Sequence, residues 1–122
     1  MGKDRILEKI IEVLPEIEYD VDNEISFMEE KESLHIILGN PLGSFLREKL
    51  QCNYEKGTLE YQQIKNLFDV FEELAESDEY FKNLLQVSIL EPLTDQKIWE
   101  NNMKQYLGPT SLSLLNHIHT YL

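Results

Sequence analysis

Apolar residues recur along the chain with the spacing of amphipathic helices. The stripe of Ile6, Ile10 and Leu14 predicts a helix over residues 5–14, which ends there because Pro15 disfavours helical geometry at the residue before it. A wider stripe predicts the strongest helix, from Leu59 to Glu76, with Thr58 as its N-cap. Its apolar face consists of Ile64, Leu67, Phe68, Phe71, Leu74 and Ala75.

The same periodicity continues on both sides of this helix. Further helices are predicted at residues 42–52, 79–90, 95–107 and 110–121. Pro92 is expected to follow the end of one of them, and Gly108-Pro109 separates the last two as a terminator followed by an initiator. In the last helix, Leu112 and Leu115 are expected to face inward. Short connections favour antiparallel neighbours, as in a helical bundle or stacked helical hairpins.

Residues 16–38 follow a different pattern. Apolar and acidic residues alternate around Tyr19, and apolar residues alternate again from Leu34 to Leu38, which is the period of short strands. The Glu, Lys and Met residues at 28–32 favour a helix instead, so strand, helix and ordered loop all stay open. The expected fold is therefore one mostly α domain over residues 1–122, with a possible small β element near residues 17–38.

Charge adds a strong asymmetry to this picture. The chain has 11 Lys and Arg against 23 Asp and Glu, a net charge of −12 at pH 7. Nine carboxylates and a single base lie between Glu12 and Glu32, and six carboxylates and no base lie between Asp69 and Glu79. Nucleic acid and anionic membrane are attracted by clustered lysine and arginine, so neither is expected as a partner. Such acidic clusters attract basic macromolecules.

Two acidic surfaces are candidate contact sites. The first consists of Asp69, Glu72, Glu73, Glu76, Asp78 and Glu79, and the second of Asp20, Asp22, Glu24, Glu29 and Glu30. Four acids stacked along the polar side of a helix repel one another by ~0.5–1 kcal/mol in total. A solvated helix face and a surface for a basic partner both account for the pattern, and Tyr19 or Tyr54 would supply aromatic anchors.

Catalytic and metal-binding patterns are weak. No nucleophile elbow or phosphate-binding loop occurs, and Cys52 is the single cysteine. Glu32 and His35 have the Glu-x-x-His spacing of di-iron bundles but lack the second pair that such a site needs. His117 and His119 are two residues apart and would point to opposite faces of a helix. We therefore expect a protein that is not an enzyme and that holds no metal or cofactor.

The expected location is the cytoplasm. No apolar run approaches the roughly 20 residues of a membrane span. Met1 to Leu14 carries acids where a secretory signal would have an uninterrupted apolar core. A lone cysteine cannot form an internal disulfide, which fits a reducing compartment.

Four segments carry a resemblance to a known family. They are Leu34–Gly39 (LHIILG), Phe68–Leu74 (FDVFEEL), Val87–Leu93 (VSILEPL) and Tyr106–Ser111 (YLGPTS). Together they resemble a family of small bacterial helical proteins that end in a leucine-glycine-proline-lysine-serine motif. The resemblance spans Leu34 to Leu115, and Thr110 stands where lysine is usual.

The resemblance implies a function that the residues alone do not. Some of these relatives resemble immunity proteins, which are cytoplasmic inhibitors encoded beside secreted polymorphic toxins. The resemblance implies a non-enzymatic binding protein that covers the active surface of a cognate toxin. The acidic surfaces would suit a basic toxin domain. The alternatives are a helical scaffold or adaptor without a toxin partner, and a carboxylate–histidine metalloprotein that uses Glu32 and His35.

Overall fold

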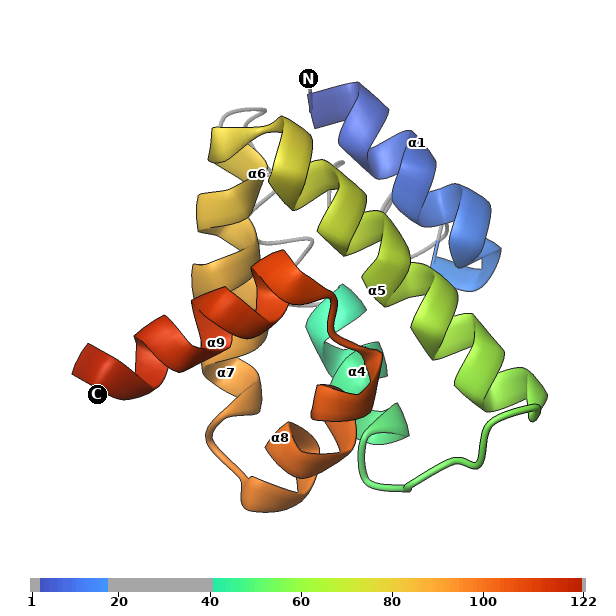
Figure 1. Cartoon of the computed structure of the whole chain (residues 1–122). Coiled ribbons are helices and arrows are strands. Elements are labelled where there is room, and N and C mark those ends of the chain that lie inside the picture. Colours follow the sequence, from blue (N-terminus) through green and yellow to red (C-terminus); the bar gives the residue numbers. More distant parts are fainter. Residues whose placement is uncertain (1–2, 18–40, 122) are drawn as a thin grey trace.

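The computed structural model describes residues 3–17 and 41–121 (Figure 1). All regular elements in these two ranges are helical, so the chain is mostly α, as predicted. The strand, helix and loop alternatives for residues 18–38 lie outside the described residues. Ile17, at the edge of that segment, ends a short 3-10 helix.

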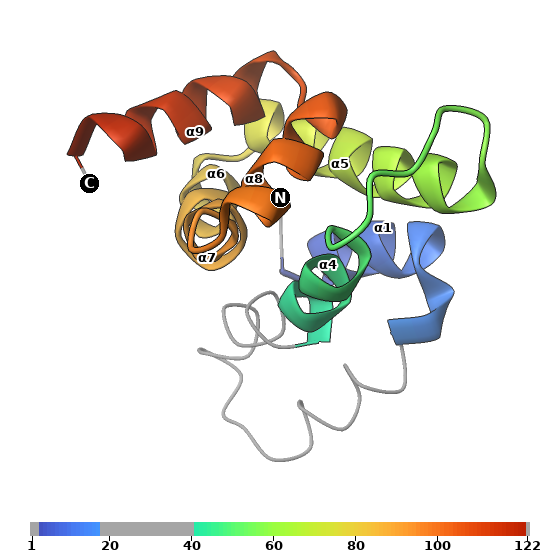
Figure 2. The same cartoon turned by 90° about the horizontal axis from the view of Figure 1, so that it is seen from below.

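A pair of helices forms one side of the fold. Helix α1 (Lys3–Val13) stops before Pro15, which begins the 3-10 helix η1 (Pro15–Ile17). The long helix α5 (Leu59–Ser77) lies beside α1 and runs antiparallel to it (Figures 1 and 2). The predicted N-cap of α5 is confirmed, because the Thr58 hydroxyl accepts a hydrogen bond from the Tyr61 N–H at 3.1 Å. Helix α4 (Gly43–Lys49) precedes α5, and Gly57 has the positive φ of 96° that glycine tolerates best.

A second helical run leaves the end of α5 at a steep angle (Figure 1). It consists of α6 (Glu79–Leu84), the π-helix η3 (Leu85–Leu90) and α7 (Glu91–Leu93). The prediction that Pro92 follows the end of this helix is wrong, since the run continues to Leu93. In the π-helix the Glu91 N–H reaches back to the Gln86 carbonyl, five residues earlier. This wider turn lets the chain continue past a proline that would otherwise crowd the preceding turn.

The chain ends in two further helices. Helix α8 (Lys97–Met103) tightens into the 3-10 helix η4 (Lys104–Tyr106), and α9 (Pro109–Tyr121) begins at the predicted proline. Ser111, Leu114, Leu115 and Ile118 form the buried side of α9. The expectation that Leu112 faces inward is wrong, because 42% of this residue is exposed.

A chain of aromatic rings lies in the centre of the fold and connects three elements. Tyr106 of η4 packs on Tyr61 and Phe68 of α5, with ring centroids 5.0 and 6.0 Å apart. Phe71 continues the contact to Phe81 of α6 at 6.0 Å. Around these rings the core buries side chains from α1 through α8: Ile6, Ile10, Leu14, Leu42, Leu46, Leu50, Ile64, Leu67, Leu74, Leu85, Leu90, Leu93 and Met103. The polar side of α5 is thereby left facing outward.

Candidate functional site

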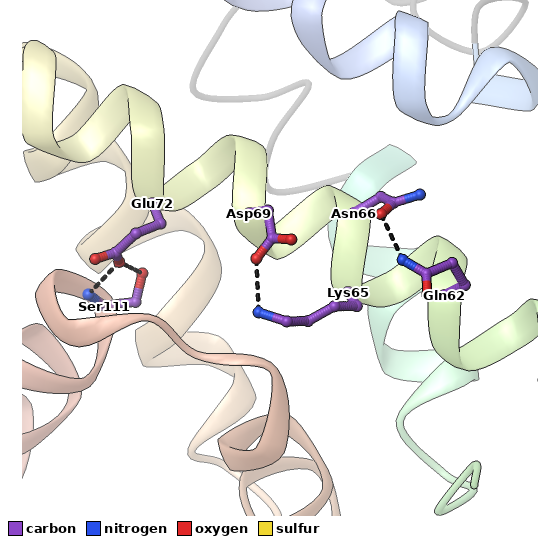
Figure 3. A network of polar contacts seen from close by, with 6 residues as sticks. All are labelled: Gln62, Lys65, Asn66, Asp69, Glu72 and Ser111. Carbon is purple, nitrogen blue, oxygen red and sulfur yellow. Dashed lines mark hydrogen bonds and ion pairs between the residues drawn. The ribbon is translucent and has the colours of Figure 1, made fainter. Parts of the chain in front are cut away.

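The first predicted acidic surface lies along the outer side of α5 and around the corner into α6. Figure 3 shows the polar side of α5, where Gln62 donates a hydrogen bond to Asn66 and Lys65 to Asp69. Glu72, one turn further, points toward the start of α9 instead. The six predicted acids therefore have different surroundings, and the structure divides them into two groups.

Glu72 belongs to the group that holds the fold together. Its Oε2 accepts a hydrogen bond from the Thr110 N–H at 2.7 Å, and its Oε1 accepts from the Ser111 N–H at 2.9 Å. The Ser111 hydroxyl donates a third bond to Oε1, also at 2.9 Å. The two backbone donors are the first free N–H groups of α9, so Glu72 of α5 caps another helix. Glu72 was predicted to be one of the surface acids, because nothing in its local sequence distinguishes it from them.

Asp78 is the second acid with a capping role. Its Oδ1 accepts hydrogen bonds from the Tyr80 N–H at 2.9 Å and the Phe81 N–H at 3.2 Å. Asp78 is therefore the N-cap of α6, which begins at the first residue of the helix predicted over 79–90. The same residue was also predicted to contact a partner, and its carboxylate is already committed to this helix start.

Lysines from outside the cluster pair with three of the other acids. Lys65, one turn earlier on α5, lies 2.6 Å from Asp69, and Lys9 of α1 lies 2.9 Å from Glu73. Lys82 stands at 4.0 Å from Glu79. These pairs reduce the repulsion expected along α5, although exposed pairs of this kind contribute little stability. The side chain of Glu73 stays 62% exposed and that of Glu79 86% exposed.

Exposed carboxylates are concentrated where α5 turns into α6. Glu73, Glu76 and Glu79 are exposed there, and Tyr80 adds an aromatic side chain that is 47% exposed. We call these four residues the α5–α6 acidic surface. Tyr54, one of the two predicted anchors, is half-buried and packs against the core, whereas Tyr80 was not predicted. In the sequence, the position of Tyr80 close to the capping Asp78 and outside the apolar stripe of α6 was the available indication that its ring is exposed.

An open groove borders this surface. It has a volume of about 580 Å³ and lies between α6–η3 and α9. Its lining is mostly polar: Glu79, Lys82, Asn83, Gln86, Pro109, Thr110, Ser113, Leu114 and His117. Amide, hydroxyl and charged groups of both signs line it, so it offers hydrogen bonds rather than an apolar pocket.

The remaining predicted groups lie elsewhere. The second acidic surface (Asp20, Asp22, Glu24, Glu29 and Glu30), Tyr19, and the Glu32–His35 pair lie outside the described residues. His117 and His119 are both on α9, and His119 Nε2 lies 3.0 Å from a carboxylate oxygen of Glu100 on α8. In the part of the chain that the structure describes, no three His, Cys, Asp or Glu side chains are grouped to hold a metal ion.

Comparison with known proteins places the chain in a family. It belongs to the family described as "Domain of unknown function (DUF7674)", whose model matches residues 7–121. No curated protein and no solved structure matches the chain. Over the described residues, none of the helices has both the length and the apolar character needed to cross a membrane.

Proposed function

We propose that this protein is a non-enzymatic acidic binding protein, and specifically an immunity protein that neutralises a bacterial toxin by covering its active surface. The α5–α6 acidic surface is the observation that carries the proposal. It combines the exposed carboxylates of Glu73, Glu76 and Glu79 with the exposed ring of Tyr80. The resemblance of the LGPTS segment and its neighbours to immunity-protein relatives supplies the toxin as the partner.

The physical support lies in what this surface offers to a basic protein. Carboxylates held on rigid helices raise a fixed negative potential, which steers and accelerates encounter with a positive surface. A tyrosine among them provides the kind of anchor that carries affinity at interfaces. The net charge of −12 extends the same field over the molecule. A nuclease toxin is positively charged where it binds nucleic acid, so an acidic protein would suit that surface.

Co-purification tests this proposal. The tagged chain would be expressed with the open reading frames that neighbour its gene, and whatever co-elutes would be identified. We expect a stoichiometric complex with a basic protein that is toxic when expressed alone, and dissociation of the complex at high salt. A chain that stays monomeric at every salt concentration, with no such neighbour, would favour the helical scaffold or adaptor instead.

A further inference from the structure

Helix α9 has no N-terminal cap from its own part of the chain. Its first helical hydrogen bond runs from the Leu112 N–H to the Gly108 carbonyl at 2.9 Å, which makes Gly108 the N-cap residue. Gly108 has no side chain to accept from the first turn, and Pro109 has no N–H to satisfy. Among the described residues, the carboxylate of Glu72 from α5 accepts from the free N–H groups of Thr110 and Ser111. Figure 3 shows its contact with Ser111.

We propose that Glu72 is an acid-sensitive latch, which keeps α9 docked on α5 while it is ionised and releases the start of α9 when it is protonated. Three donors converge on the two carboxylate oxygens: two backbone N–H groups and the Ser111 hydroxyl. A protonated carboxyl carries a hydrogen on one oxygen and no charge, which makes it a weaker acceptor for these three groups. It also loses the charge that the positive end of a helix dipole favours.

The groups that surround Glu72 indicate that its release occurs at acidic pH. The α9 residues that donate to Glu72, Thr110 and Ser111, carry no ionisable side chain. The groove beside Thr110 is lined by three ionisable side chains, Glu79 and Lys82 of α6 and His117 of α9, whereas the η3 segment packed on α9 has none. On α5 itself, Asp69 and Glu76 lie about one turn away on either side. Burial alone would raise the pKa of Glu72, but hydrogen bonds from Ser111 and Thr110 outweigh it and hold that pKa below its usual value.

The lowered pKa of Glu72 sets the sign of the pH dependence of stability. Glu72 is ionised more readily in the folded chain than in the unfolded chain, so its contribution is complete above the ordinary glutamate range near pH ~4.3. The contribution is lost as the pH falls through the lower folded value. Release would loosen the packing of Leu115 and Ile118, which α9 buries against the rest of the core.

Hydrogen exchange of Glu72→Gln and Glu76→Gln tests the latch, because both replace a carboxylate of α5 by an isosteric amide. At neutral pH we expect E72Q to lower the protection of the α9 amides at Leu114 and Leu115 about tenfold, which corresponds to ~1.4 kcal/mol and lies within the range for a lost helix cap. E76Q changes an exposed carboxylate and should leave α9 as in the wild type. Unchanged α9 protection in E72Q would overturn the proposal.

The wild-type chain provides a second test that does not need a folded variant. Protection of α9 and α5 would be followed as the pH is lowered, with each value corrected for the intrinsic exchange rate. A latch requires α9 to lose protection at a higher pH than the middle of α5. Simultaneous loss in both helices would show general acid unfolding and contradict the latch.

Discussion

Glu72 occupies the space that a side chain at position 108 would need. A Cβ added to Gly108 would lie 2.5 Å from the Cδ of Glu72 and 2.9 Å from its Oε1. Carbon atoms do not approach that closely, so residue 108 has to be glycine if Glu72 is to reach the start of α9. The Gly108-Pro109 pair therefore has a tertiary role in addition to its local one as a terminator and initiator of helices.

Gly108→Ala should destabilise the fold through this contact. The new methyl group would displace the Glu72 carboxylate from α9, and we expect the free energy of unfolding to fall by about 1–3 kcal/mol. Chemical denaturation of the wild type, G108A, E72A and the double variant measures it. Because E72A already removes the obstructing carboxylate, G108A should cost clearly less in that background. Additive effects would contradict the contact.

Asp78→Ala and Glu76→Ala should separate capping acids from surface acids. Asp78 accepts from two N–H groups of the first turn of α6, so its removal should cost about 1–2 kcal/mol of unfolding free energy. Glu76 is exposed, and its removal should change stability by less than about 0.5 kcal/mol. Denaturant titration of both variants is the measurement, and equal losses would refute this division.

Tyr106→Phe should raise stability. The ring of Tyr106 is fully buried, and its hydroxyl has no hydrogen-bond partner among the described residues. Removing an unsatisfied buried hydroxyl while keeping the ring should increase the free energy of unfolding by about 1 kcal/mol. Tyr80→Phe is the control, because its side chain is partly exposed and its hydroxyl can reach water. A loss of stability in Y106F would indicate that the hydroxyl has a partner.

Tyr106 also predicts how stability falls at alkaline pH. Burial, with smaller contributions from Tyr61 and Tyr54, raises the pKa of Tyr106 to about 12. An unfolded tyrosine ionises near pH ~10, so between these values the folded state holds a proton that the unfolded state has lost. Stability should therefore fall as the pH rises through this window. The slope should be shallower in Y106F, and identical slopes in the two proteins would contradict this origin.

Charge reversal should locate the surface that meets the proposed partner. Glu76→Lys with Glu79→Lys changes the net charge by the same amount as Glu55→Lys with Glu60→Lys, at the other end of α5. Once a partner is in hand, we expect the first pair to slow association about tenfold at low salt and the second to have a smaller effect. Stopped-flow kinetics at two salt concentrations measures this, since screening should reduce the difference. Equal effects would indicate that net charge alone steers association.

Local chemistry made most helix boundaries predictable. A cap or a proline acts on its own turn, so the sequence around Thr58 and Pro109 was enough to place two helix starts. The end of the α6–η3–α7 run was predicted incorrectly. The exclusion of proline from helices assumes α-helical geometry, and the chain widens into a π-helix before Pro92.

The acidic residues of the candidate surface could be predicted from the sequence. Which of them cap a helix and which stay exposed could not. Acidic residues at helical spacing in the sequence marked the outer side of α5, and the structure places Asp69, Glu73 and Glu76 exposed there. The ion-pair partners of these acids could not all be predicted from the sequence, because Lys9 contacts Glu73 from a helix that is 64 residues away in the chain. Tyr80 was missed for a related reason, since its exposure depends on how α6 packs on α5.

The sequence by itself determined that the chain is helical, where most helices start, and that it is strongly acidic, because these properties depend on neighbouring residues and on composition. The tertiary structure alone decided what each acid does. Glu72 and Ser111 are 39 residues apart, and only the packing of α9 across α5 brings the carboxylate to the free N–H groups. The same packing decided that Ser111 is buried and Leu112 exposed, since the side of α9 that faces the core is set by where α9 docks.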